Sequence, residues 1–203
     1  IISVDGQTFN VKGPNYHHRV TTSLLGSHQM ENGAAAIGAV ELLRQQGLNI
    51  SPEAVQRGMM NVKWPGRLEI LCRQPLIVAD GAHNTQSILR LKQALGDHFP
   101  SHQIRLIIGL SAEKDIESIA DLLAPIAQHV SATQSKHPRA LPPETIARAF
   151  AARGALTSIC ASVDEAIIQT TSLARHGDLL LSTGSLFVVA ETRESLGYTT
   201  LGA

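Results

Sequence analysis

The sequence predicts an α/β fold whose main part, residues 67–203, is Rossmann-like and contains a mostly parallel six-stranded sheet. Short apolar runs alternate there with longer segments of helical character, and these are long enough to serve as the crossover helices that parallel strands require. Polar residues follow several of the apolar runs, as they do where α/β proteins bind ligands at strand carboxyl ends. The predicted strands are 67–72, 76–80, 104–110, 129–133, 156–160 and 178–182, and the predicted helices are 85–96, 116–123, 143–153, 163–175 and 185–195.

Residues 1–63 have a different rhythm and are predicted to belong to another domain. The stretch up to Gly26 is polar and alternating, with several turn residues. A helix rich in small residues is predicted over 29–46, with Gly47 placed to end it. A second helix is predicted to start at Ser51-Pro52, because serine is a good N-cap and proline suits the first turn. Trp64-Pro65-Gly66 then opposes regular structure, so residues 64–66 are predicted to be an interdomain linker.

Composition excludes several classes of partner. The 203 residues carry 17 basic and 17 acidic side chains, so the chain lacks the positive charge expected of a nucleic-acid binder. Its apolar runs are far shorter than the roughly 20 residues needed to span a bilayer. Cys72 and Cys160 lie in separate apolar stretches and fit buried thiols of a reducing compartment. We therefore expect a cytoplasmic protein with no nucleic-acid or membrane partner, and a chain that begins within a longer protein.

The most informative motif is Asp80-Gly81-Ala82-His83-Asn84, which follows the apolar run 76–79 and opens a predicted helix. Asp80 could accept hydrogen bonds from ribose hydroxyls, and His83 lies near a helix start whose free amides favour an anion. An equally plausible interpretation is structural: Asp80 would cap the next helix and His83 would stabilise a turn. The residues of this motif alone do not decide between the two.

Three other segments carry candidate binding residues. Arg67, on the stiff turn after Trp64-Pro65-Gly66, is suited to hold a phosphate, although single arginines are usually solvated. Asn32, near a predicted helix start, could recognise a base edge, but ordinary capping by Ser27 is the simpler explanation. Ser185, in Thr183-Gly184-Ser185-Leu186, could hold a carboxylate or phosphate, or could simply cap the last helix.

Taken together and in order, these motifs resemble those of folylpolyglutamate synthases and dihydrofolate synthases, which are related to the Mur ligases. The resemblance rests on Leu25-Gly26-Ser27-His28-Gln29 with Asn32, Trp64-Pro65-Gly66-Arg67-Leu68-Glu69, the motif 80–84 and the motif 183–186. It extends to Lys114-Asp115, where the family often has Asp-Lys-Asp and this chain has Glu113 first, and to Pro138-Arg139-Ala140.

The resemblance implies an ATP-dependent ligase that activates a folate or pteroate carboxylate as an acyl phosphate, which the amine of L-glutamate then attacks. Carried over by position, Asn32 would face the adenine, Arg67 would reach the phosphates or ribose, and Asp80 would hold the ribose. His83 would lie close to the reacting phosphate and the incoming glutamate, and Ser185 would help to hold the glutamate carboxylate. His83 and Arg67 would be the catalytic residues, acting by position and charge.

One part of the family pattern is missing. No Gly-x-x-x-x-Gly-Lys-Ser/Thr occurs in the chain, so the phosphate-binding loop is expected upstream, as are the ligands of Mg²⁺; no metal site is expected within these 203 residues. Residues 1–63 would then be the last part of a P-loop ATPase domain, 67–203 the complete C-terminal domain, and the chain alone would be inactive. The helix after Asn32 would expose apolar surface and favour self-association or local disorder. The intact enzyme is expected to be a monomer.

Other functions remain open at this point. A Mur-type peptidoglycan ligase is the nearest enzyme alternative, although such relatives more often show Asp-Tyr-Ala-His where this chain has Asp80-Gly81-Ala82-His83. A non-catalytic nucleotide-binding module is the alternative outside enzymes. A dinucleotide-binding oxidoreductase is disfavoured, because no Gly-x-Gly-x-x-Gly follows a predicted strand.

Overall fold

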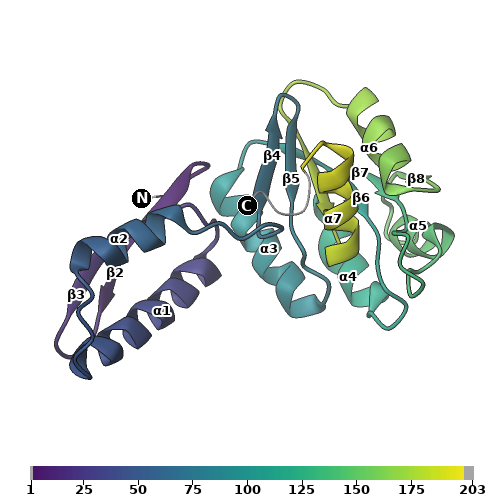
Figure 1. Cartoon of the computed structure of the whole chain (residues 1–203). Coiled ribbons are helices and arrows are strands. Elements are labelled where there is room, and N and C mark those ends of the chain that lie inside the picture. The colour runs from purple at the N-terminus through teal and green to yellow at the C-terminus, as the bar shows by residue number, and fades with distance from the viewer. Residues whose placement is uncertain (1, 199–203) are drawn as a thin grey trace. The chain divides into compact units, whose positions relative to one another are not determined.

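The computed structural model describes residues 2–198, and residues 199–203 of the predicted C-terminal domain lie outside the described part. Contacts divide the chain into two compact units (Figure 1). The first comprises the residues up to Pro65 together with Gln93–Pro100, and the second comprises Gly66–Lys92 and the residues from Ser101 onward. The division between Pro65 and Gly66 falls inside the predicted linker.

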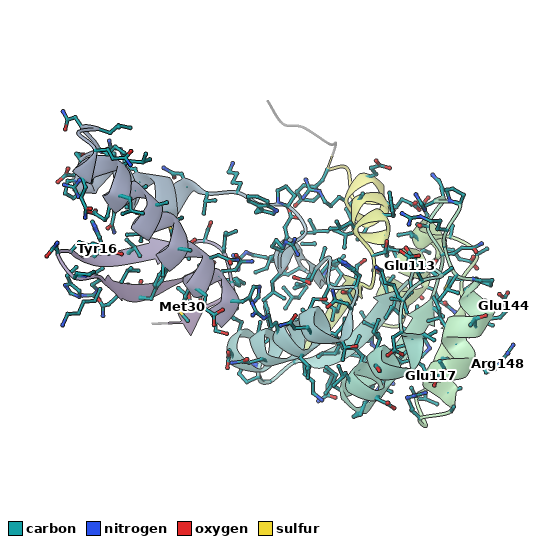
Figure 2. All side chains as sticks on the ribbon, turned by 90° about the horizontal axis from the view of Figure 1, so that it is seen from below. Tyr16, Met30, Glu113, Glu117, Glu144 and Arg148 are labelled. Atoms are coloured by element: carbon teal, nitrogen blue, oxygen red, sulfur yellow. The ribbon has the colours of Figure 1, made fainter. Side chains whose placement is uncertain are left out.

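The first unit contains a small antiparallel sheet that the sequence analysis did not identify. Its strands β1 (Ile2–Ser3), β2 (Gly6–Lys12) and β3 (His17–Thr22) lie in the order β1-β2-β3. The alternation of the N-terminal stretch is the period-2 pattern of such strands. The connection between β2 and β3 is closed by a hydrogen bond from the Gly13 N–H to the carbonyl of Tyr16, a residue labelled in Figure 2.

Two helices complete this unit. In α1 (Ser27–Gln45) Gly26 occupies the N-cap position and no side chain caps the helix, so the expected capping by Ser27 is wrong. In α2 (Pro52–Asn61) the Ser51 hydroxyl accepts the Ala54 N–H at 3.2 Å, as its Ser-Pro start predicts. A local core lies between the helices and the sheet, made of Val11, Val20, Ile37 and Val55.

Helix α1 has a second apolar face that this core does not cover. Ala35, Ala39, Leu42 and Leu43 are exposed at helical spacing, and Leu42 is 60 % exposed. The predicted exposure of apolar surface after Asn32 is therefore present in the structure. Self-association or disorder as its consequence remains a prediction.

The second unit has the predicted fold: one six-stranded, mostly parallel sheet. Its strands lie in the order β4-β5-β9-β6-β7-β8; β4 is antiparallel to β5, and the other neighbours are parallel. The strands are β4 (Glu69–Arg73), β5 (Leu76–Ala79), β6 (Gln103–Ile108), β7 (Ala127–Ala132), β8 (Thr157–Ile159) and β9 (Asp178–Thr183). Strand β4 begins two residues later than predicted, because Arg67 and Leu68 form a turn.

The helices of this unit also follow the prediction closely. They are α3 (Thr85–His98), α4 (Ile116–Leu123), α5 (Pro143–Ala151), α6 (Val163–Ser172) and α7 (Leu186–Ser195), with a short 3-10 helix η1 (Ala124–Ile126) after α4. The end of α3, from Gln93 onward, is counted with the first unit. Ser185 is the N-cap of α7 and does not itself belong to the helix. Strand β9 is buried along its whole length, as expected for a central strand covered on both faces.

Helices α6 and α7 cover one face of the sheet. Val163 and Ile167 of α6 pack with Val188 of α7 against Ile107 of β6. Val189 of α7 packs against the neighbouring strands β4, β5 and β9. Helix α7 therefore spans the half of the sheet that carries the candidate site. Among residues 2–198, no helix has both the length and the apolar character that a membrane crossing requires.

Candidate functional site

Three loops are joined by backbone hydrogen bonds at the carboxyl ends of β5 and β9. The Gly81 N–H donates to the Gly66 carbonyl at 2.9 Å, and the Gly184 N–H donates to the Ala82 carbonyl at 3.0 Å. The Asp80 N–H donates to the Ser182 carbonyl at 3.0 Å. Since parallel strands end at one edge, these bonds bring the loops around residues 66–68, 80–83 and 182–185 together.

Glycines make this close approach possible. A Cβ at Gly81 would lie 2.4 Å from the Leu186 side chain, and one at Gly184 would lie 2.6 Å from the Gly109 carbonyl oxygen. Gly66 and Gly184 also have φ angles of +72° and +97°, which side-chain-bearing residues rarely adopt. The geometry of this edge therefore requires glycine at 66 and 184, whereas at 81 an added Cβ would meet only the movable end of the Leu186 side chain.

Asp80 is buried and its carboxylate holds two of the loops in place. Oδ2 accepts the Leu68 N–H and Oδ1 accepts the Ala82 N–H, each at 2.8 Å. Burial raises the pKa of Asp80, while these two N–H groups and the charges of Arg67 and His83 oppose the rise. The expected capping of the next helix by Asp80 is wrong, because Asn84 Oδ1 accepts the Ser87 N–H at the start of α3.

The bond from Asp80 also maintains an unusual backbone conformation. Leu68 has a φ of +46°, although it is not glycine, and its side chain is buried. Such conformations cost about 1–3 kcal/mol and persist only where the surroundings determine them. Asp80 Oδ2 is one of the groups that hold Leu68, and with it the adjacent Arg67, in this turn.

Replacing Asp80 with asparagine is expected to reduce the free energy of unfolding by about 1–3 kcal/mol. The asparagine NH₂ would face one of the two backbone N–H groups that the Asp80 carboxylate accepts, and that N–H would lose its acceptor. Urea denaturation followed by circular dichroism measures the loss. Amide hydrogen exchange at Leu68 and Ala82 should accelerate at the same time. Unchanged stability and exchange would contradict the structural role of this carboxylate.

His83 presents one ring nitrogen to its surroundings. Its Nδ1–H donates to the Gly81 carbonyl at 2.8 Å, since a carbonyl can only accept, and its backbone N–H donates to the Ser87 hydroxyl. In the neutral ring this leaves Nε2 as a hydrogen-bond acceptor. The half-buried imidazole is thus oriented by its own loop.

The other predicted residues are placed as follows. Ser185 is buried, and its Oγ accepts the Phe187 N–H at 3.1 Å as the cap of α7. Arg67 lies between Gly66 and Leu68 and is partly exposed. Arg67, Asp80, His83 and Ser185 therefore belong to one edge of the second unit. Asn32 lies on α1 in the first unit, where its Nδ2 donates to Gln29 Oε1.

No described group of three or more His, Cys, Asp or Glu residues could hold a metal ion.

Sequence reasoning missed two residues that shape this edge, Glu69 and Arg193, which form an ion pair. Glu69 was visible within the motif Trp64–Glu69, but nothing in the sequence indicated its partner 124 residues later.

Comparison with known proteins supports the resemblance. Residues 66–186 match the family model described as Mur ligase, glutamate ligase domain. The chain is 31 % identical over 185 residues to a probable bifunctional folylpolyglutamate synthase/dihydropteroate synthase of Halobacterium salinarum, covering 91 % of this chain and 22 % of the relative. It is 28 % identical over 195 residues to the dihydrofolate synthase/folylpolyglutamate synthase of Bacillus subtilis, covering 94 % of this chain and 44 % of that protein.

Solved structures give the same result. The Mycobacterium tuberculosis folylpolyglutamate synthase complexed with ADP matches with a TM-score of 0.88 and 27 % identity over 98 % of this chain and 46 % of that one. The Thermotoga maritima folylpolyglutamate synthase matches with a TM-score of 0.81 and 26 % identity, covering 97 % of this chain and 45 % of that one. The chain thus spans less than half the length of these relatives. On this evidence the chain belongs to the Mur ligase family, among the relatives of folylpolyglutamate and dihydrofolate synthases, and carries its glutamate ligase domain.

Proposed function

We propose that this chain forms the C-terminal part of an ATP-dependent ligase that adds L-glutamate to dihydropteroate or to reduced folates. The observation that carries the proposal is the joined edge of loops 66–68, 80–83 and 182–185, which gathers Arg67, Asp80, His83 and Ser185. The similarity to a folylpolyglutamate synthase complexed with ADP over 98 % of the chain supports it.

The proposed reaction has two steps. A carboxylate oxygen of the folate or pteroate attacks the γ-phosphorus of ATP, and ADP leaves. The neutral amine of glutamate then attacks the acyl carbon of the resulting acyl phosphate, phosphate leaves, and the nitrogen loses a proton as the amide forms. Because the reacting groups are largely anionic, the task of the protein is mainly to position them and to compensate their charge.

The nucleotide fits the residues of this edge. Arg67 supplies a cation on a rigid turn, and it would contact the phosphates or ribose. Asp80 already accepts two N–H groups, but each oxygen keeps a further lone pair for a ribose hydroxyl. Asn32 would face the adenine. ATP, when bound, supplies the phosphoryl group that activates the carboxylate.

His83 and Ser185 would act on the glutamate side. The free Nε2 of His83 can accept a hydrogen bond from the glutamate amine, and its fixed ring orientation favours this. Ser185 lies at the N-terminus of the ten-residue α7, where unpaired N–H groups favour a carboxylate. Together they would hold the amino acid beside the reacting phosphate.

The rest of the ATP site would come from a part of the protein outside this chain. The Mg²⁺ ligands and the phosphate-binding loop would lie there, since the sequence contains no Gly-x-x-x-x-Gly-Lys-Ser/Thr. The exposed apolar face of α1, formed by Ala35, Ala39, Leu42 and Leu43, would be covered by the same part. Residues 1–63 would then be the last portion of a P-loop ATPase domain.

The 203-residue chain alone is therefore expected to show no ligase turnover. The measurement is ADP release with ATP, Mg²⁺ and L-glutamate, using dihydropteroate in one series and tetrahydrofolate in another. The complete Bacillus subtilis relative is the positive control.

A chimera that joins this chain to the N-terminal part of that enzyme should release ADP only when all substrates are present. Its His83→Ala variant should lose at least about a hundredfold in kcat/KM. Turnover by the chain alone would refute the fragment hypothesis, whereas glutamate-independent activity of a folded chimera would refute the proposed reaction.

A further inference from the structure

The turn that carries Arg67 is fixed to the second unit on both sides of that residue. Before it, the Gly66 carbonyl accepts the Gly81 N–H at 2.9 Å, and the Gly66 N–H donates to Glu69 Oε2 at 2.8 Å. After it, the Leu68 N–H donates to Asp80 Oδ2 at 2.8 Å. Gly66 and Leu68 are both buried. The backbone of Arg67 thus has very little freedom.

The side chain of Arg67 is different. Within residues 2–198, no hydrogen bond or ion pair engages its guanidinium, and the residue is partly exposed. The charge of Arg67 acts on the buried Asp80 carboxylate, but no described acceptor occupies its N–H groups, so this cation on a constrained backbone is arranged to meet a ligand. Whatever fixes the turn therefore fixes the position from which this cation acts.

Glu69 is the group that links the turn to the helix layer. One of its oxygens accepts the Gly66 N–H, and the other is paired with Nη1 of Arg193 on α7. The Glu69 and Arg193 side chains are only 24 % and 15 % exposed, so water weakens their pairing less than it would at the surface. Arg193 is itself held, because its guanidinium lies over the Tyr198 ring, 5.4 Å from the centroid.

Helix α7 connects the Glu69–Arg193 pair to Ser185. Its N-cap is Ser185, and Arg193 lies two turns further along the same helix. Tyr198, just after the helix, donates its hydroxyl hydrogen to the Leu71 carbonyl of β4. The same rigid element thus presents Ser185 at one end and fixes the Arg67 turn from the other.

We infer that Glu69 and Arg193 are positioning residues, which hold the turn Gly66–Leu68 so that Arg67 is placed for the phosphates or ribose of a nucleotide. This inference rests on the proposed function, because it takes the nucleotide as the ligand of Arg67. Neither residue touches the reacting groups. Their effect passes through the Gly66 N–H and the backbone of the turn.

The test uses the chimera of this chain with the N-terminal part of the Bacillus subtilis enzyme, which supplies the rest of the proposed ATP site, and ADP is the probe. Affinity is measured by calorimetry and by the NMR shift of Arg67 Nε–H, with Arg67→Ala as the reference for a lost contact. Glu69→Gln and Arg193→Met should each weaken ADP binding about tenfold, approaching Arg67→Ala. Arg193→Lys, which keeps the charge, should recover part of the affinity. Amide exchange at Gly66 and Leu68 should accelerate in Glu69→Gln and Arg193→Met.

The matched control is Arg153→Met. Arg153 is 19 % exposed, close to the 15 % of Arg193, and pairs with the exposed carboxylates of Asp121 and Glu117 on α4, the latter labelled in Figure 2. It is thus an arginine of similar burial that does not contact the Arg67 turn. This variant should leave ADP binding and Gly66 exchange unchanged.

Two failures can be told apart. If Arg67→Ala weakens ADP binding but Glu69→Gln and Arg193→Met do not, the positioning role is overturned and the proposed nucleotide contact stands. If the unmodified chimera and its Arg67→Ala variant respond equally to ADP, or neither responds, the nucleotide contact fails and the inference fails with it. Unchanged exchange at Gly66 in Glu69→Gln would overturn the structural part of the inference on its own.

Discussion

Arg105→Met is expected to lower the free energy of unfolding of the second unit by about 3 kcal/mol. The Arg105 Nε donates to Asp178 Oδ2 at 2.5 Å, and the two side chains are only 8 % and 5 % exposed. Asp178 Oδ2 also accepts the Arg175 N–H at 2.9 Å. Removing the guanidinium would leave a carboxylate buried with one backbone donor, and the cost of that uncompensated charge dominates the effect.

Urea denaturation followed by circular dichroism measures the loss, and two variants establish its cause. The double variant Arg105→Met with Asp178→Asn should regain a large part of the stability, because it removes the buried charge as well. Arg153→Met, which breaks pairs with exposed carboxylates, should cost about 1 kcal/mol or less. If the double variant were as unstable as Arg105→Met, lost packing and not the buried charge would be the cause.

The Arg105–Asp178 pair also makes the free energy of unfolding depend on pH in a defined direction. Burial alone would raise the pKa of Asp178, but the hydrogen bonds from Arg105 and the Arg175 N–H, with their charges, outweigh it and hold that pKa below its ordinary 3.8. A carboxyl whose pKa is lowered on folding stabilises the fold above its unfolded pKa, and that stability is lost as the pH falls through the folded pKa. The double variant should therefore show a flatter decline of stability below about pH 4.

Gly184→Ala is expected to lower the free energy of unfolding by about 3 kcal/mol and to disturb the candidate site. Gly184 has a φ of +97°, and an added Cβ would lie 2.6 Å from the Gly109 carbonyl oxygen and 2.8 Å from the Ile108 side chain. A backbone atom cannot move away as a flexible side chain could. The loop itself would have to shift, and the bond from its N–H to the Ala82 carbonyl would be strained.

A matched glycine separates the clash from the effect of backbone conformation. Gly154 has a φ of +79°, but nothing lies within 4 Å of an added Cβ. Gly154→Ala should therefore cost only about 1 kcal/mol. Denaturation curves of the two variants, with the amide shifts of Ala82 and Ser185, measure the difference. If both variants lost the same free energy of unfolding, the close approach of Gly184 to β6 would contribute nothing to the cost of Gly184→Ala.

Much of the second unit could be predicted because its signals are local. Continuous apolar runs such as 76–79 and 179–181 identify buried parallel strands, since both faces of such strands are covered. The helices between them have recognisable starts, such as Pro143 and the Asp115 and Ser162 N-caps. Strand-helix alternation then implies a mostly parallel sheet, which is confirmed.

The first unit was predicted less completely. The hairpin of β2 and β3 is polar on one side and short, so its alternation resembles that of an irregular surface segment. Its burial arises from Val11 and Val20 meeting Ile37 and Val55, which come from two helices later in the chain. Only that long-range contact distinguishes a strand from a polar loop.

By itself, the sequence determined the fold class, the family motifs and the residues that carry charge and hydrogen-bonding groups, because periodicity and residue type are properties of short segments. It could not determine what each of those groups contacts. The tertiary structure shows that Asp80 holds two loops instead of capping a helix, and that Glu69 meets Arg193 across 124 residues. Such pairings depend on strand order and helix packing, and these are decided only when the whole unit folds.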